Sequence, residues 1–355
     1  MSYRTWGITV LAFLLTLLIG TAAVTAAVDP YFHYHRPLDC LEYPLNVQRE
    51  RYLNDGIIKH FRYDALITGT SMTENFKASE LDELFGVNSI KVPFSGAQYK
   101  EINENLELAA AVNPDLKMVV RGLDLLALLS DKDLTAYDDY PDYLYDDNLF
   151  NDVNYVLNKT VLFEDLWPVL RNTLSGTDGT SFDAYGNWNA LMTFGKASVD
   201  ASYTRPEKAD VQDGPEALSE EERSRIRENL KQNVTDLAEQ NPEIEFYLFF
   251  TPYSIYYWDS VNQNGFLSKM LAAEKEAAEW LLEYENIHLY SFFDEFDMIC
   301  DADNYTDYIH YGEWVNSRIL VWMKEGKHRL TRENYQEYYD RVYDFYMGYD
   351  YDSLF

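Results

Sequence analysis

The sequence predicts an α/β fold in which a central parallel sheet of about five strands is covered by helices on both faces and preceded by a transmembrane helix. Short apolar runs that end in small-residue turns alternate with amphipathic stretches along most of the chain. This alternation is typical of repeated strand–turn–helix units. Polar residues gather where the predicted strands end, which is where parallel sheets bind ligands. A charge-free stretch at the start of the chain predicts the transmembrane helix.

The N-terminal stretch determines the predicted location of the protein. Residues 6–28 carry no charge, whereas Arg4 precedes them and Asp29 follows them. A stretch of this length spans a bilayer as one helix. The positive charge on its N-terminal side predicts a single-pass protein with residues 1–5 in the cytoplasm and the main domain outside the cell. A cleaved signal peptide is the alternative, because small residues cluster at 21–26.

The predicted elements follow in order along the chain. Residues 29–61 form an aromatic-rich juxtamembrane segment, and the first strand, 65–68, runs into Gly69, Thr70 and Ser71. We expect the helix after Ser71 to offer backbone N–H groups to an anion. Ser79 and Gly86 are predicted to cap a helix at 79–85. Further strands are predicted at 89–92, 118–120, 245–250 and 287–290, and further helices at 99–113, 219–239, 266–283 and 313–325.

Two stretches depart from the repeating pattern. Residues 131–215, dense in Asp and Tyr and punctuated by Gly, interrupt the domain that otherwise runs from 62 to 325. We interpret them as an insertion that forms either a lid or cleft wall, or an irregular surface excursion. Residues 326–355 are predicted to form an aromatic, acidic helix that packs back on the domain, with a partner-binding face as the alternative. Its apolar face carries Tyr335, Tyr338, Val342 and Phe345.

Composition excludes some classes of partner and leaves the cysteines open. The chain has 29 Lys and Arg against 60 Asp and Glu, a net charge of −31. So acidic a protein repels nucleic acid and anionic lipid head groups. In an oxidising exterior Cys40 and Cys300 either form a disulfide or stay as two free thiols. We find no Cys/His spacing for zinc, no calcium loop and no phosphate-binding glycine run, so we expect no metal and no cofactor.

A short motif after the last strand carries the chemistry. Asp307 precedes His310 by three residues, so its carboxylate can reach the imidazole and fix its tautomer. The other imidazole nitrogen is then free to take a proton from a serine. Ser71 is expected at the same edge of the sheet, at the end of the first strand. Glu74 and Tyr253 are candidates for lining the cleft, although a helix-start role for Glu74 and a packing role for Tyr253 are the alternatives.

Four blocks in this order resemble those of the SGNH (GDSL-like) hydrolase superfamily. Gly69-Thr70-Ser71 resembles the Gly-Asp-Ser block, and Ser95-Gly96 resembles the glycine block after the second strand. Gly122-Leu123-Asp124 resembles the Gly-x-Asn block, and Asp307 to His310 resembles the Asp-x-x-His block. The resemblance covers residues 62–325 apart from the insertion. It implies a flavodoxin-like three-layer sandwich.

The resemblance also implies roles for these residues. Ser71 would be the nucleophile, His310 the general base and Asp307 the residue that orients it. The oxyanion hole would use the backbone N–H groups of Ser71 and Gly96. Asp124 departs from the family, because a carboxylate cannot donate a hydrogen bond as the usual asparagine does. Either Asp124 points elsewhere, or it is held protonated, or the hole has two donors.

The N-terminal helix narrows the resemblance. The chain is similar to membrane-anchored extracellular SGNH-like proteins of Gram-positive bacteria, of the type that transfers D-alanine to teichoic acids or O-acetylates glycans. This implies a serine esterase or acyltransferase of the cell envelope that acts on acyl esters of glycans. The alternative is a non-catalytic partner of a membrane-bound O-acyltransferase that binds glycan or an acyl carrier. A structural surface protein is a third reading.

Overall fold

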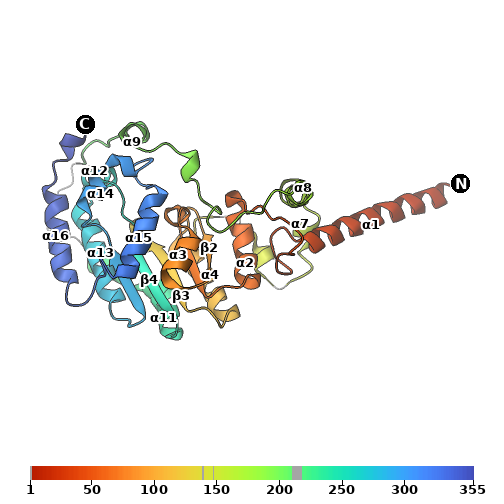
Figure 1. Ribbon diagram of the computed structural model, residues 1–355, viewed down its shortest axis with the longest axis horizontal. Helices are drawn as coiled ribbons and strands as arrows, with labels where there is room; N and C mark the ends of the chain where they lie inside the picture. The colour runs from red at the N-terminus through yellow and green to blue at the C-terminus, as the bar shows by residue number, and fades with distance from the viewer. Residues whose placement is uncertain (1, 138–139, 147, 210–217) are drawn as a thin grey trace. The chain divides into compact units, whose positions relative to one another are not determined.

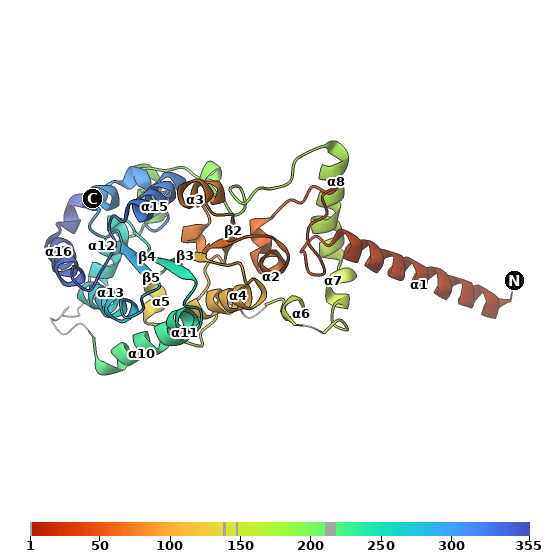
Figure 2. The same ribbon diagram turned by 60° about the horizontal axis from the view of Figure 1, so that its bottom comes forward.

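A computed structural model of the chain describes residues 2–137, 140–146, 148–209 and 218–355 (Figures 1 and 2). The chain forms two compact units. The first, here called the N-terminal unit, combines Met1–Arg62 with Asp139–Ser181. The second, the sheet unit, combines Tyr63–Asp138 with Phe182–Phe355. The stretch 131–215, predicted as one insertion, therefore contributes to both units.

The sheet unit is built on five parallel strands in the order β2-β1-β3-β4-β5. Nearly all of their residues are buried, which is why these strands read as continuous apolar runs in the sequence. The predicted α/β class and the parallel sheet are confirmed. Each strand lies where the sequence predicts it, and β3 continues three residues further, to Leu123. The strands are β1 (Ala65–Gly69), β2 (Ser89–Pro93), β3 (Met118–Leu123), β4 (Glu245–Phe250) and β5 (Ile287–Ser291).

The helices of the sheet unit mostly begin and end as their capping residues predict. Gly86 ends α3 with a φ of 72°, and Ser219 with Glu222 forms the capping box of α10. Ser79 is not a cap, since its hydroxyl donates to Asp183 and Lys77 occupies the N-cap position. The main helices are α3 (Ala78–Phe85), α4 (Tyr99–Val112), α10 (Glu220–Leu230), α11 (Asp236–Gln240), α12 (Ile255–Gln263), α13 (Leu267–Leu281), α15 (Glu313–Glu325) and α16 (Tyr335–Gly348), and the shorter ones are α5 (Leu125–Leu128), α9 (Lys196–Ser202) and α14 (Phe296–Cys300).

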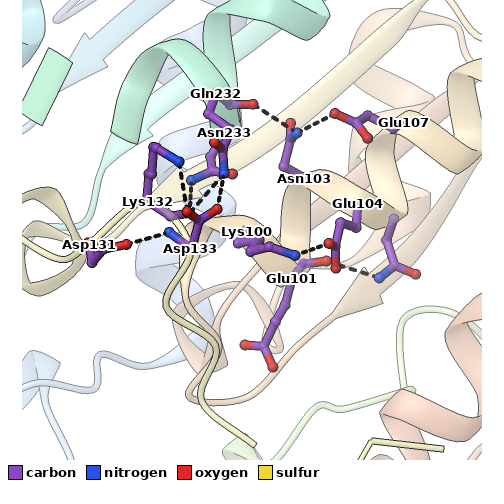
Figure 3. A network of polar contacts seen from close by, with 11 residues as sticks. Lys100, Glu101, Asn103, Glu104, Glu107, Asp131, Lys132, Asp133, Gln232 and Asn233 are labelled. Atoms are coloured by element: carbon purple, nitrogen blue, oxygen red, sulfur yellow. Dashed lines mark hydrogen bonds and ion pairs between the residues drawn. The ribbon is translucent and has the colours of Figure 1, made fainter. Parts of the chain in front are cut away.

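A π-helical segment, Lys231–Thr235, separates α10 from α11, so the single helix predicted at 219–239 is divided. Polar contacts hold the backbone of this segment. The carbonyl of Asn233 accepts a hydrogen bond from the buried Arg121 at 2.7 Å, and its side-chain amide donates to the carbonyl of Lys132 at 2.8 Å. Figure 3 shows Gln232 and Asn233 facing the 131–133 loop. π-helical segments inside α-helices are a common cause of helix kinks.

The N-terminal unit surrounds the end of α1 (Tyr3–Val28), which is long and apolar enough to cross a membrane. Asp29 follows α1, and its carboxylate accepts the backbone N–H groups of His33, Tyr34 and His35 at 2.8 to 3.0 Å. The hydroxyl of Tyr155 donates to the same carboxylate, which ties 139–181 to the juxtamembrane segment. The other helices are α2 (Glu50–His60), α6 (Asp142–Tyr145), α7 (Val153–Val156) and α8 (Trp167–Ser175), which continues a π-helical segment at Val161–Leu166.

Candidate active site

Ser71 lies at the carboxyl end of β1, where a glycine makes the turn possible. Gly69 has a φ of 147°, and a Cβ there would lie 2.6 Å from Cγ2 of Thr73. Ser71 then opens a single 3₁₀ turn, Ser71–Thr73, rather than the helix that we expected, because α3 begins only at Ala78. The Ser71 side chain is partly exposed. The turn therefore presents a hydroxyl at the sheet edge without a helix N-terminus behind it.

The Asp307–His310 loop brings an imidazole to Ser71. A bridge between Tyr305 and Tyr311 closes the base of the loop. One carboxylate oxygen of Asp307 accepts the backbone N–H groups of Ile309 and His310 at 2.7 and 2.8 Å. The other lies 2.8 Å from Nδ1 of His310, and Nε2 of His310 lies 2.9 Å from Oγ of Ser71. The three residues thus form a continuous chain of hydrogen bonds in the order of a catalytic triad.

The pKa values of His310 and Asp307 shift in the directions that suit a base and the acid that orients it. Burial acts to lower the pKa of His310, but the hydrogen bond and charge of Asp307 outweigh it, and the carboxylates of Glu74 and Asp124 add to the rise. Burial acts to raise the pKa of Asp307, but the contacts with His310 lower it overall. The carboxylate of Asp307 therefore stabilises the imidazolium form of His310.

Two backbone N–H groups are available as oxyanion donors. Within the described part of the chain, the N–H groups of Ser71 and Gly96 donate to no protein acceptor. Gly96 has a φ of 67°, in the left-handed region that glycine adopts at low cost. The hydroxyl of Tyr137 donates to the neighbouring carbonyl of Ser95 at 2.6 Å and so holds this turn. Both donors lie in turns that follow adjacent strands of the sheet, β1 and β2.

Asp124 follows β3, and its side chain is occupied by buried hydroxyl groups. Thr70 donates to one carboxylate oxygen at 2.6 Å, and Tyr253 donates to the other, with Thr251 3.4 Å away. Burial raises the pKa of Asp124, although these hydrogen bonds oppose the rise. Of the three arrangements considered for Asp124, these contacts match the one in which its carboxylate points elsewhere, toward Thr70 and Tyr253. Thr70 directly precedes Ser71, so Asp124 helps to hold the turn that carries Ser71.

The remaining candidates and one unpredicted residue surround this centre. Tyr253 is 1% exposed, so it packs beneath the site instead of lining a cleft. Glu74 is also buried, and its charge acts on His310. Trp188 meets the ring of His310 edge-on at 5.6 Å, and its backbone N–H donates to Asn75 at 3.1 Å. Sequence reasoning missed Trp188 because it belongs to no motif and lies in the irregular stretch.

Apart from this centre, the structure describes the two cysteines and the possible metal ligands. Cys40 is an exposed free thiol in the N-terminal unit, and Cys300 is a partly buried free thiol in the sheet unit. The structure thus contains no bond between them, and their pairing stays a prediction. Among the described residues, no group of three or more His, Cys, Asp or Glu side chains is placed to hold a metal ion.

Comparisons of the chain with protein-family models, curated proteins and solved structures find no significant match.

Proposed function

We propose that this chain is a membrane-anchored extracellular serine esterase or acyltransferase of the SGNH type, which acts on acyl esters of cell-envelope glycans. The observation that carries the proposal is the hydrogen-bonded chain from Asp307 through His310 to Ser71. The strand order β2-β1-β3-β4-β5 is also that of flavodoxin-like sheets, which supports a three-layer sandwich. Ser71 follows the carboxyl end of β1, and His310, which is held by Asp307, lies 2.9 Å from Oγ of Ser71.

The proposed reaction is acyl transfer through a seryl ester. As Oγ of Ser71 attacks the ester carbonyl, Nε2 of His310 takes its proton, and Asp307 stabilises the imidazolium. The N–H groups of Ser71 and Gly96 donate to the oxyanion, and one such donor typically lowers the barrier by about 3 kcal/mol. His310 then returns the proton to the leaving sugar oxygen. Water or a second sugar hydroxyl, deprotonated by His310, finally takes the acyl group from Ser71, and His310 returns this proton to Oγ of Ser71.

The proposed cellular setting is supported by α1. This helix is long and apolar enough to span a membrane. The charge of Arg4 on its N-terminal side supports an exported sheet unit. Acyl groups on envelope glycans are esters within reach of an anchored enzyme. The net charge of −31 makes nucleic acid an unsuitable substrate.

Hydrolysis of p-nitrophenyl acetate by the full chain in detergent tests this proposal. We expect release of p-nitrophenol and, after acid quenching, an acetylated peptide that contains Ser71. Ser71→Ala should remove both signals. The matched control is Ser224→Ala, an exposed serine of α10 that should leave both unchanged. Hydrolysis that persists in Ser71→Ala would refute the assigned nucleophile.

A second candidate function is a non-catalytic partner of a membrane-bound O-acyltransferase that binds a glycan or an acyl carrier. A cavity of about 470 Å³ favours it, because apolar side chains dominate its lining and Tyr308 and Ile309 form part of its wall. The buried hydroxyl of Tyr257, which also lines this cavity, has no hydrogen-bond partner among the described residues. Affinity purification from native membranes separates the candidates. Recovery of an acyltransferase with both wild type and Ser71→Ala would favour the second.

A further inference from the structure

The N-terminal unit exposes an unusual number of large apolar side chains. Six of them fall within residues 149–174, and each of these side chains is more than half exposed. Exposed apolar side chains that gather in one segment are typical of an interaction site, whereas single scattered ones are ordinary surface. The six are Leu149 (73%), Phe150 (95%), Val153 (52%), Phe163 (74%), Trp167 (53%) and Leu174 (83%).

Three of these side chains form one stripe along a helix. The π-helical segment Val161–Leu166 continues directly into α8, and Phe163, Trp167 and Leu174 recur along it at helical spacing. The opposite side is fixed to the unit by polar contacts. Asp165 accepts the hydroxyl of Tyr31 at 2.6 Å, and the hydroxyl of Thr173 accepts the N–H of Glu42. The stripe therefore faces outward because the other face is already occupied.

The contacts with α1 set the depth of this stripe. Leu162 and Phe163 line a groove together with residues of α1 that run from Phe13 to Val24. A bilayer core about 30 Å thick takes about 20 residues of a helix that rises 1.5 Å per residue. Every 20-residue window within the charge-free stretch 6–28 contains residues 9–25. Any placement of α1 across a membrane therefore puts the groove, and with it Phe163, at the depth of the acyl chains.

We propose that the segment 149–175 is a second membrane contact, which lies in the outer part of the bilayer beside α1 and takes lipid acyl chains in its groove. Figure 2 shows α7 and α8 beside the C-terminal end of α1, and α1 contacts α7 and the π-helical segment Val161–Leu166. Two acidic side chains of the segment are paired, since Arg49 lies 2.8 Å from Glu164 and 3.2 Å from Asp165. Trp167 suits the boundary between acyl chains and head groups.

This contact goes beyond the proposed function and is independent of whether Ser71 reacts. It requires that α1 spans a membrane with the N-terminus on the cytoplasmic side. The acidity of the chain argues against attraction by anionic head groups, so the contact is apolar. A segment embedded beside the anchor would also fix the orientation of the N-terminal unit, because two attachments remove its rotation about α1.

Tryptophan quenching in the full chain tests the proposal. The protein is placed in phosphatidylcholine nanodiscs with or without bromine on the acyl chains, and the Trp167 signal is taken as wild type minus Trp167→Phe. We expect brominated lipid to reduce this signal about twofold or more, since bromine reaches only groups at acyl depth. A second reading uses Phe163→Trp in the Trp167→Phe background, which should be quenched as well. The difference for Trp314→Phe, in α15 of the sheet unit, should not change.

Aqueous iodide provides the opposing measurement. Quenching of both reporters by iodide but not by brominated lipid would show that the stripe faces water and would overturn the proposal. Protection from both quenchers would overturn it too, because a second copy or another protein would then cover the stripe. Quenching by brominated lipid alone supports it.

Discussion

The Asp307 side chain shows how one residue can build a loop and tune a base at once. One of its oxygens holds the backbone of the loop through two N–H groups, and the other holds the imidazole of His310. The position of His310 relative to Ser71 therefore depends on the Asp307 carboxylate, which contacts both the loop backbone and the imidazole. The same carboxylate outweighs the effect of burial and raises the pKa of His310.

The raised pKa of His310 predicts a pH profile. The imidazole can accept the Ser71 proton only in its neutral form, so kcat/KM should rise with pH through an apparent pKa above the ordinary value of 6.5. Asp307→Asn should move this limb to lower pH, because the charge that raises the pKa is gone. It should also reduce the rate by about 10⁴-fold, as loss of the orienting acid does in comparable triads. A profile of p-nitrophenyl acetate hydrolysis from pH 5 to 9 measures both effects. An unchanged limb in Asp307→Asn would contradict the assignment.

Asp124 offers a second prediction at this scale. Its buried carboxylate lies one hydrogen bond from Thr70, so Asp124→Asn removes negative charge near the developing oxyanion. We expect acylation of Ser71 to become roughly tenfold faster, which corresponds to about 1.4 kcal/mol of barrier. Tyr253→Phe is the matched control, because it removes a hydrogen bond to Asp124 but keeps the charge, and it should bring no acceleration. Acylation that is much slower in Asp124→Asn would show instead that the carboxylate is required. Stopped-flow measurement of the acylation phase decides.

The three residues of the hydrogen-bonded chain could be predicted from the sequence, whereas the residues that support them could not. Ser71 follows an apolar run, and Asp307 and His310 have a spacing that local geometry can satisfy. The contacts of Asp124 with Thr70 and Tyr253 join residues far apart in the chain. Buried hydroxyls of this kind carry no motif, because any Thr or Tyr at a suitable position would serve. Trp188 was missed for the same reason.

At the scale of elements, α16 is attached to the sheet unit through a buried carboxyl group. Glu274 of α13 accepts the hydroxyls of Ser291 and Tyr339 at 2.7 and 2.9 Å. The hydroxyl of Tyr338 donates to Ser291 at 2.7 Å. Burial raises the pKa of Glu274 to about 8, against the ordinary 4.5, because it disfavours the charged form of the carboxyl group. The folded state is therefore most stable when Glu274 is protonated, although the hydrogen bonds from Ser291 and Tyr339 favour its ionised form.

This attachment predicts how stability depends on pH. Between pH 4.5 and about 8 the folded state keeps the Glu274 proton and the unfolded state releases it, so stability falls as pH rises. Relative to Glu274→Gln, the wild type should lose about 1.4 kcal/mol per pH unit across this range. Urea unfolding of both proteins at four pH values, followed by tryptophan fluorescence, measures the difference. A difference that does not change with pH would contradict the buried neutral state.

The elements themselves were well predicted where local signals are strong. Gly86 and the Ser219–Glu222 pair end and begin helices as expected. The division of the helix at 231–235 was not predictable, because the carbonyl of Asn233 in this segment is bound by Arg121 of β3, which is distant in the sequence. The helix expected after Ser71 is a single turn for a related reason. Helix-forming residues there give way to the turn that Gly69 and Thr70 impose.

For the whole molecule, the central feature is that the chain forms two units, one that contains α1 and one that contains the sheet. Asp29 connects the juxtamembrane segment with residues 139–181, because its carboxylate accepts hydrogen bonds from both. No sequence period marks this association, so the stretch looked like one insertion. The N-terminal unit is therefore more than a linker between anchor and sheet.

Membrane attachment through α1 gives a prediction at this scale. The full chain should stay in the membrane pellet after alkaline carbonate washing. Leu14→Arg combined with Leu15→Arg should release it, because each arginine near the helix centre costs about 2.5 to 3.5 kcal/mol on insertion. Leu38→Arg, outside the span, is the control and should remain in the pellet. Release of the wild type by carbonate, with residues 1–28 missing by mass spectrometry, would establish the cleaved signal peptide instead.

The central claim is that Ser71 is a nucleophile activated by His310, and covalent labelling tests it most directly. A fluorophosphonate probe reacts with serines that an adjacent base activates. The full chain in detergent should be labelled on the peptide that contains Ser71. Ser224→Ala should be labelled equally, whereas Ser71→Ala and His310→Ala should show no label. Labelling of Ser71→Ala at wild-type level, or no labelling of the wild type, would contradict the account.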